Sequence, residues 1–506
     1  MTAHSSPSLQ ANEASGAACS IDGRATAAEV DASCRWPLLL LFTSGVCWLV
    51  FGTFLALIAA IKLHKGDFLA ECPWLTLGRI RPASMNSFLY GFASQVGMGV
   101  MLWLMCRLGR VKLYFQWPVI VAWNLWNIGV TIGVIAIMAG ASTGFEWLEM
   151  PRAVAGMLFV AYAIVGICAV ATFVMRRECE VYPSQWYLLA ALFWFPWIYS
   201  AANYLLVLDP VRGTMQAAVN GWFTGNFAGL WLTPLGLAGI FYFVPRQSGQ
   251  PLHSRELAAY GFWTLAFFAN FSGLTGLIGG PVPRWMPAVS TAANVCLLVA
   301  VISNVLNWHL TCRAACAACT GSDHDAWKKD SVLCFVLFGA LAYLVHGVVS
   351  ALMSVPQVAS ITNFTYAIVA RNNLLLHGFV GMVLFGCLYY IIPQLTRVKW
   401  PNEKWIRVHL LCSMIGVALL FLGLGLGGVL QGLKLARPAV PFMDVVRGTV
   451  PFVGLSTLGV LLLLVGQIAF VANLTGLLRA FLAPMCQSFC AEYCGGVPAA
   501  KAGVKS

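Results

Sequence analysis

The chain has 506 residues, of which 60% are hydrophobic and only 9% are charged, and its mean hydropathy is +0.80. This composition excludes a soluble globular protein, in which about 25% of the residues are charged. The net charge of +12 does not indicate nucleic-acid binding, because the Lys and Arg residues fall in short segments between apolar stretches. We therefore expect a polytopic protein whose main partner is the lipid bilayer, with no nucleic-acid partner.

Apolar windows long enough to cross a bilayer occur along the whole chain. Twelve such windows are centred near Leu49, Gly97, Thr131, Tyr162, Trp197, Leu232, Phe268, Ala300, Leu344, Met382, Leu420 and Leu462. The predicted fold class is all-α, with one twelve-helix membrane domain at 36–475. A disordered tail is expected at 1–35, which is rich in Ala and Ser and lacks the Arg-led apolar core of a signal peptide, and a second tail at 476–506.

The basic residues between the spans predict the orientation. With the N-terminus inside, 19 Lys and Arg residues face the cytoplasm and 10 face outward, and Arg371 remains within a span. Because cytoplasmic loops carry the excess of Lys and Arg, both termini are expected on the cytoplasmic side.

Two groups of cysteines follow the eighth and the last predicted spans. Cys312, Cys316 and Cys319 form one group, for which His324 is the nearest additional ligand; the other group is Cys486, Cys490 and Cys494. Three thiolates with a fourth ligand can hold zinc or an iron–sulfur cluster. The alternative is incidental or acylated cysteine beside the membrane.

Four spans contain residue patterns that an apolar membrane span does not need. In chain order they are RIRPASMNSFLYG, which contains Ser84, NGWFTGNFAGLWLTP, which contains Gly225, NFSGLTGLIGGPVPRW, which contains Thr275 and Gly276, and ITNFTYAIVARNNLLLHGFVGMVLFG, which contains Arg371, Asn372, Asn373 and His377. A charged side chain near the middle of a membrane costs at least about 2.5 kcal/mol, so Arg371 needs a polar environment inside the protein.

These segments resemble the second, sixth, seventh and tenth helices of subunit I of the heme-copper oxidases. The similarity is closest to the C-type cytochrome c oxidases and the nitric oxide reductase large subunits. The resemblance implies a twelve-helix bundle of a bacterial inner membrane that reduces oxygen or nitric oxide, with six histidines that hold two hemes and a copper. At those six positions this chain has Ser84, Gly225, Thr275, Gly276, Arg371 and Asn373.

None of these six side chains is a usual ligand of heme iron or copper. We therefore expect neither copper nor heme and no catalysis of the family's kind. The leading hypothesis is a pseudoenzyme, a structural or regulatory component of a respiratory complex whose partners are the other subunits. One alternative is an oxidase or heme electron carrier that uses His377 and His346 as relocated ligands. A third is a transporter or proton channel through the vacated cavity.

Arg371 can be explained in three ways. It can be a drifted residue in an emptied cavity, a contact between subunits, or, with Asn372 and Asn373, the lining of a polar cavity for an anion or a proton-linked small molecule. No Asp or Glu lies inside the sixth, seventh, ninth or tenth span, so carbonyls, the two asparagines or a bound anion must balance the charge. His377 follows Asn373 by four residues, which predicts the same helix face and makes His377 the first candidate for a retained heme.

Overall fold

A computed structural model describes residues 23–318 and 330–493. Within these ranges the chain forms helices and no strands, and twelve helices are long and apolar enough to cross a membrane. Each of the twelve predicted centres falls inside one of these spans, which confirms the predicted fold class. The chain is a multi-pass membrane protein.

Several spans combine α-helical segments with π-helical or 3₁₀ segments, which are labelled η. The elements in chain order are α2 (Ala27–Lys62), η1 (Pro73–Leu75), α3 (Leu77–Asn86), η2 (Ser87–Ser94), α4 (Gln95–Gly109), α5 (Gln116–Ala139), α6 (Arg152–Val174), α7 (Pro183–Asn203), η3 (Tyr204–Leu208), α8 (Met215–Asn226), η4 (Phe227–Leu232), α9 (Thr233–Ser248), α10 (Arg255–Phe268), η5 (Ala269–Phe271), η6 (Leu274–Leu277), α11 (Trp285–Ala318), α12 (Ser331–Ser354), α13 (Pro356–Thr362), α14 (Tyr366–Asn373), η9 (Leu374–Gly381), α15 (Met382–Thr396), α16 (Glu403–Leu435) and α17 (Phe442–Tyr493).

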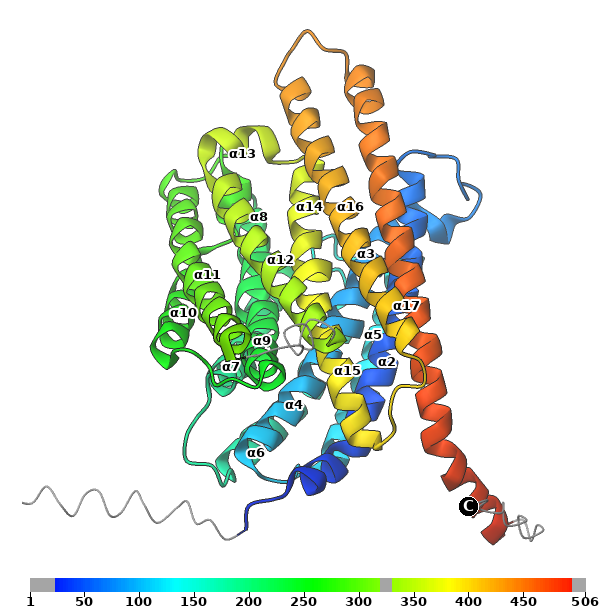
Figure 1. The fold of residues 1–506 in the computed structure, drawn as a ribbon. Coiled ribbons are helices and arrows are strands. Elements are labelled where there is room, and N and C mark those ends of the chain that lie inside the picture. Colours follow the sequence, from blue (N-terminus) through cyan, green and yellow to red (C-terminus); the bar gives the residue numbers. More distant parts are fainter. Residues whose placement is uncertain (1–22, 319–329, 494–506) are drawn as a thin grey trace, which may run out of the picture.

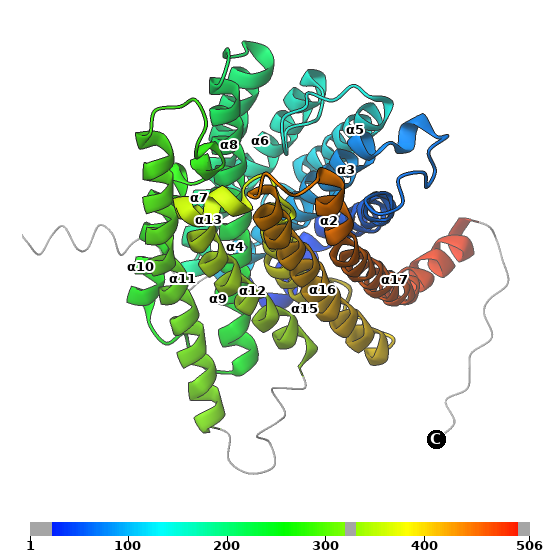
Figure 2. The ribbon, with the colours of Figure 1, turned by 90° about the horizontal axis from the view of Figure 1, so that it is seen from above.

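The second, sixth and tenth spans form the centre of the bundle. Their most apolar windows are 100%, 83% and 89% buried, whereas those of the other nine spans are 28–50% buried. The remaining helices surround them, with α10 and α11 on one side and α16 and α17 on the other (Figures 1 and 2). The most buried spans therefore include three of the four that carry the specific motifs.

Each central span contains a π-helical segment, namely η2, η4 and η9. A π-helical segment widens the helix locally and changes which residues share a face. The second and tenth spans meet at their π-helical segments, where the Phe88 and His377 rings lie 4.4 Å apart. Side-chain directions in these spans therefore do not follow the 3.6-residue period of an α-helix.

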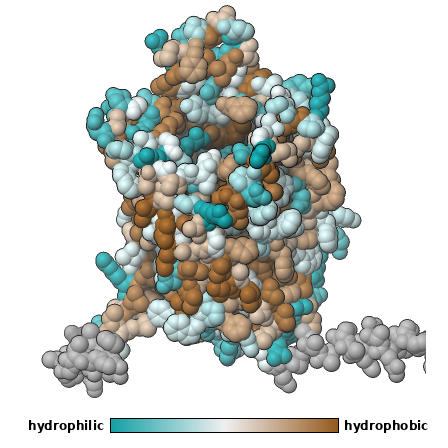
Figure 3. All heavy atoms as spheres, turned by 180° about the vertical axis from the view of Figure 1, so that it is seen from behind, coloured by the Kyte–Doolittle hydropathy of each residue, from teal (hydrophilic) through white to brown (hydrophobic). Residues whose placement is uncertain are grey.

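The outer surface suits a bilayer. On the face drawn in Figure 3, hydrophobic residues gather across the middle and hydrophilic residues lie mostly toward the two ends. The start of α2 and the end of α17 lie at the same end of the bundle (Figure 1), as an even number of spans requires.

Helices α2 and α17 extend beyond 36 and 475, the predicted limits of the membrane domain. Helix α2 begins at Ala27 because Thr26 and Glu29 form a capping box, in which Thr26 Oγ1 accepts from Glu29 N at 3.3 Å. The first turns are held further by Asp31, which accepts from Trp103 Nε1 and pairs with Arg107, both at 3.0 Å. At the other end, α17 continues to Tyr493.

The two cysteine groups are only partly described. Cys312 lies on α11 and Cys486 is exposed on α17. Cys319, His324 and Cys494 lie outside the described residues, and so do the side chains of Cys316 and Cys490. The predicted metal clusters at these groups stay predictions.

Candidate functional site

Two adjoining cavities lie beside the central spans. The first, here called the Arg371 cavity, has a volume of about 340 Å³, and the second, the Asn373 cavity, about 530 Å³. Both are lined by Glu146, Trp147, Phe364, Ile368 and Asn372.

The structure brings four of the six predicted ligand positions together. Gly225, Thr275, Gly276 and Arg371 all line the Arg371 cavity, although they come from three different spans. Asn373 lines the Asn373 cavity. The predicted polar triad is thus divided, with Arg371 on one cavity, Asn373 on the other and Asn372 on both.

Ser84 lines neither cavity. Its hydroxyl donates to the carbonyl oxygen of Gly52 on α2, at 2.7 Å. This hydrogen bond joins the first and second spans.

Gly225 lies where only glycine fits. A Cβ atom placed there would lie 2.7 Å from both the Cα of Gly273 and the carbonyl oxygen of Ser272, which are backbone atoms and cannot turn aside. Gly273 in turn has φ +100°, a conformation that favours glycine, and its own Cβ would clash with the carbonyl of Gly221. By contrast, nothing lies within 4 Å of a Cβ at Gly276.

The seventh span is interrupted at the same place. Ser272 and Gly273 separate η5 from η6, so the regular helix of α10 ends at Phe268. The Leu274 N–H donates to Ser290 Oγ at 3.1 Å, and Asn363 Nδ2 donates to the Thr275 carbonyl at 3.1 Å. Non-helical backbone at membrane depth is tolerated where protein groups satisfy it or a cavity adjoins it, and both conditions hold here.

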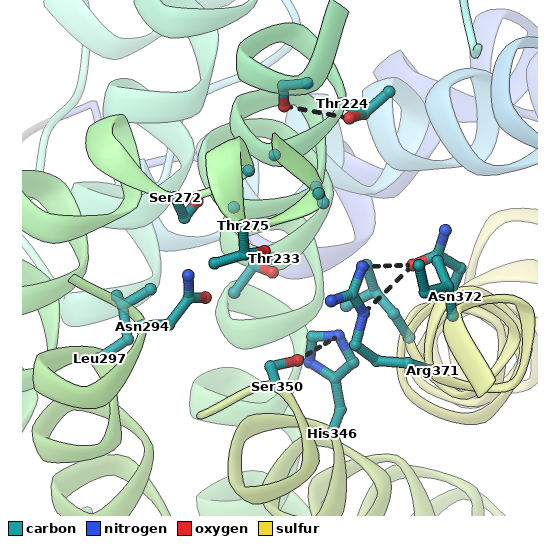
Figure 4. A pocket seen from close by; sticks show the side chains of 18 of the residues that line it. Thr224, Thr233, Ser272, Thr275, Asn294, Leu297, His346, Ser350, Arg371 and Asn372 are labelled. Carbon is teal, nitrogen blue, oxygen red and sulfur yellow. Dashed lines mark hydrogen bonds between the residues drawn. The ribbon is translucent and has the colours of Figure 1, made fainter. Parts of the chain in front are cut away.

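Arg371 extends its guanidinium from the tenth span into the cavity (Figure 4). Nε and Nη2 donate to Asn372 Oδ1, at 3.4 and 3.2 Å. Within the described residues, Nη1 makes no hydrogen bond and no carboxylate lies within 4.0 Å of the guanidinium. One edge of the charged group therefore faces open space.

His346 and His377 occupy separate environments. His346, on α12, lines the Arg371 cavity, and its Nε2 lies 3.3 Å from Ser350 Oγ (Figure 4). His377 lines neither cavity and packs against Phe88. The π-helical segment that begins at Leu374 explains why His377 does not line the Asn373 cavity with Asn373, as the α-helical period predicted.

The loop between α5 and α6 places two carboxylates, Glu146 and Glu149, at the cavities. Glu146 is exposed and lines both cavities. In the described structure Glu146 makes no ion pair with Arg371, whose guanidinium donates to Asn372, so the expectation that carbonyls, asparagines or an anion balance this charge stays a prediction. The feature of the sequence that could have pointed to these two residues is their rarity, since Glu146 and Glu149 are two of only 18 acidic residues in the chain.

The second span fixes this loop. Asn86 Nδ2 donates to Glu149 Oε2 and the Tyr90 hydroxyl donates to the Trp147 carbonyl, both at 2.7 Å. Burial raises the pKa of the Glu149 carboxyl to about 7, although the hydrogen bond from Asn86 acts in the opposite direction. Glu149 is thus a loop carboxyl that changes charge near neutral pH.

Two bulky residues that line both cavities have an unusual backbone conformation. Trp147 and Phe364 have φ of +65° and +61°. Such values are rare for large side chains and often mark functional sites. Phe364 is also 87% exposed, which places it at the edge of the cavities.

The family model for cytochrome c and quinol oxidase polypeptide I matches residues 37–462. The chain belongs to this family. It is 23% identical over 446 residues to a cytochrome c oxidase subunit 1 homolog of Azorhizobium caulinodans, covering 85% of this chain and 79% of that protein. It is 21% identical over 397 residues to the Cbb3-type cytochrome c oxidase subunit CcoN1 of Stutzerimonas stutzeri, covering 77% and 82%. A solved heme-copper terminal oxidase dimer has the same fold, with a TM-score of 0.72 at 13% identity over 88% of this chain and 84% of that chain.

The side chains at the four cavity positions where the resemblance places metal ligands do not fit heme iron or copper. Gly225 and Gly276 have no side chain to offer, Thr275 is a poor copper ligand, and Arg371 stays protonated and repels a metal cation. At Gly225 the backbone of Ser272 and Gly273 also occupies the space of a larger residue. In residues 23–318 and 330–493, no three His, Cys, Asp or Glu side chains are grouped to hold a metal ion.

Proposed function

We propose that this protein is a non-catalytic subunit I homologue, a pseudoenzyme that acts as a structural or regulatory component of a respiratory complex. The observation that carries the proposal is the Arg371 cavity. The four positions at which the resemblance places ligands of the family's reaction centre surround this one space, and a cation, two glycines and a threonine occupy them.

The packing around Gly225 supports the absence of a metal ligand there. At Gly276 an added Cβ would meet nothing within 4 Å. By contrast, the interrupted seventh span packs directly against Gly225. A Cβ at Gly225 would lie 2.7 Å from backbone atoms of Ser272 and Gly273, so this packing leaves no room for a histidine side chain.

The named relatives support assembly with other subunits. Both named relatives are subunits or subunit homologs of cytochrome c oxidase. We infer that this chain resides in a bacterial inner membrane with both termini in the cytoplasm, and that it has kept the subunit I fold because other subunits pack on it.

The test is purification of a tagged chain from its native membrane in a mild detergent, followed by native electrophoresis and identification of the co-purifying proteins. We expect respiratory-complex subunits in a defined complex, and we expect deletion of the gene to reduce the amount of that complex. A chain that purifies alone, with a deletion that leaves every respiratory complex unchanged, would contradict the proposal.

A further inference from the structure

The walls of the Arg371 cavity combine polar and apolar groups. Arg371, Ser350 and Thr275 lie around it on three different spans and supply hydrogen-bond donors (Figure 4). Leu265, Leu297 and Val301 also line the cavity and supply apolar surface. Small-molecule sites typically have volumes of about 300–1,000 Å³ and combine apolar walls with a few polar groups that converge. At about 340 Å³ the cavity matches this description.

The charge of Arg371 is incompletely balanced by the protein. A guanidinium remains protonated and requires acceptors when it lies at membrane depth. Its one side-chain acceptor within the described residues is the neutral Asn372 amide oxygen, at 3.2 and 3.4 Å. The free edge at Nη1 faces the part of the cavity where Thr275 and Ser350 lie (Figure 4).

Glu146 offers a competing explanation, because its carboxylate lines the same cavity. The backbone N–H and carbonyl of Glu146 are tied to the Asn220 side chain at 3.2 and 3.0 Å, and the residue is exposed to solvent. An exposed charge at a distance is screened and stabilises its partner weakly. Glu146 therefore leaves the guanidinium edge without a direct acceptor, and it does not account for the apolar wall.

We propose that the Arg371 cavity binds a small monocarboxylate with an apolar tail. The carboxylate pairs with the free edge of the Arg371 guanidinium and accepts from the Ser350 or Thr275 hydroxyl, and the tail packs on Leu265, Leu297 and Val301. Paired hydrogen bonds between a guanidinium and a carboxylate are among the strongest polar contacts in proteins. This inference rests on the proposed function, because it requires that no metal centre fills the cavity.

Benzoate is a suitable probe, and benzyl alcohol is its uncharged counterpart of similar shape. Calorimetric titration of the purified full chain at constant ionic strength should show one benzoate site and binding of benzyl alcohol at least about tenfold weaker, as expected for a charged hydrogen-bonded pair. Arg371→Met should weaken benzoate binding by a similar factor. Arg284→Met removes an exposed cation that lies outside the cavity and should leave the affinity unchanged.

Leu297→Trp provides a second test that leaves Arg371 in place. It fills the apolar part of the cavity and should abolish benzoate binding in a protein that elutes from size exclusion like the parent. Glu146→Gln removes the competing carboxylate and should leave benzoate binding equal or stronger. No benzoate binding, equal binding of benzyl alcohol, or full affinity in both Arg371→Met and Leu297→Trp would overturn the proposal.

Heme and copper are measured in the same preparation. A stoichiometric metal centre would overturn the proposed function whatever the titration shows. A metal-free chain that does not bind benzoate would overturn the carboxylate site alone.

Discussion

Gly225 packs so closely against the seventh span that a larger residue there is expected to destabilise the protein. In a helix, alanine is favoured over glycine by up to about 1 kcal/mol, so an ordinary helical glycine gains stability on substitution. At Gly225 the new Cβ would approach backbone atoms at 2.7 Å, and overpacking of this kind typically destabilises by about 1–3 kcal/mol. The steric effect is therefore expected to decide the sign.

We predict that Gly225→Ala lowers the midpoint of thermal unfolding in detergent. Gly276→Ala is the matched control, because the same methyl group meets nothing within 4 Å there, and its midpoint should equal or exceed that of the parent. If the two variants are equally stable, the close packing of Gly225 against Gly273 is refuted.

Glu149 gives a pH dependence that can be assigned to one residue. Its folded pKa is about 7, above the ordinary 4.5, so the folded chain holds a proton that the unfolded chain releases. Stability from this residue is complete below about pH 4.5, falls as the pH rises to about 7, and is constant above that. The total change is of order 3 kcal/mol.

Glu149→Gln should remove this dependence. The variant keeps an uncharged group of the same size next to Asn86, whose Oδ1 is buried without a partner in the described structure and can accept from the new amide. Unfolding midpoints are measured for parent and variant between pH 4.5 and 8. The parent should lose stability relative to the variant as the pH rises; parallel curves would show that Glu149 is not buried as a neutral acid.

Among the elements, the seventh span is interrupted at Ser272 and Gly273, where the regular helical hydrogen bonds stop. Ser290 is fully buried and accepts the Leu274 N–H at 3.1 Å, just beyond the break. An unpaired N–H at this depth costs about 1–3 kcal/mol. The break therefore depends on a side chain from α11.

Ser290→Ala should destabilise the chain by about that amount and increase hydrogen exchange in peptides that cover residues 270–280. Ser360→Ala serves as the control, since that hydroxyl is exposed and donates to a carbonyl three residues earlier on the same short helix. Unchanged exchange at 270–280 in Ser290→Ala would mean that the Ser290 hydroxyl does not hold this segment.

The spans could be predicted from the sequence, whereas several side-chain positions within and between them could not. The twelve apolar windows predict the spans because the hydrocarbon core imposes one length on all of them. The positions of His377 and Asn373 were not predictable from an α-helical period, because η9 is π-helical. The place of Glu146 on both cavities was not predictable, because the folding of a loop over a cavity has no periodic signal. The contact between Gly225 and Gly273 was not predictable either, because it joins different spans.

At the scale of the whole molecule, the orientation is a prediction from 19 inward and 10 outward basic residues. A reporter fused after Ser506 should be active only as a cytoplasmic marker. A matched fusion in the loop between α16 and α17, at residues 436–441, should behave as a periplasmic one. A periplasmic C-terminus would overturn the orientation and place the two cavities at the opposite side of the membrane.

The central claim is that the subunit I fold here surrounds a polar cavity in place of a metal centre. The most direct measurement is a pyridine hemochrome spectrum together with elemental analysis of copper, on the full chain purified from its native membrane. The account predicts neither heme nor copper at a stoichiometric level, because Gly225, Thr275, Gly276 and Arg371 offer no ligand. Stoichiometric heme or copper in that preparation would contradict it.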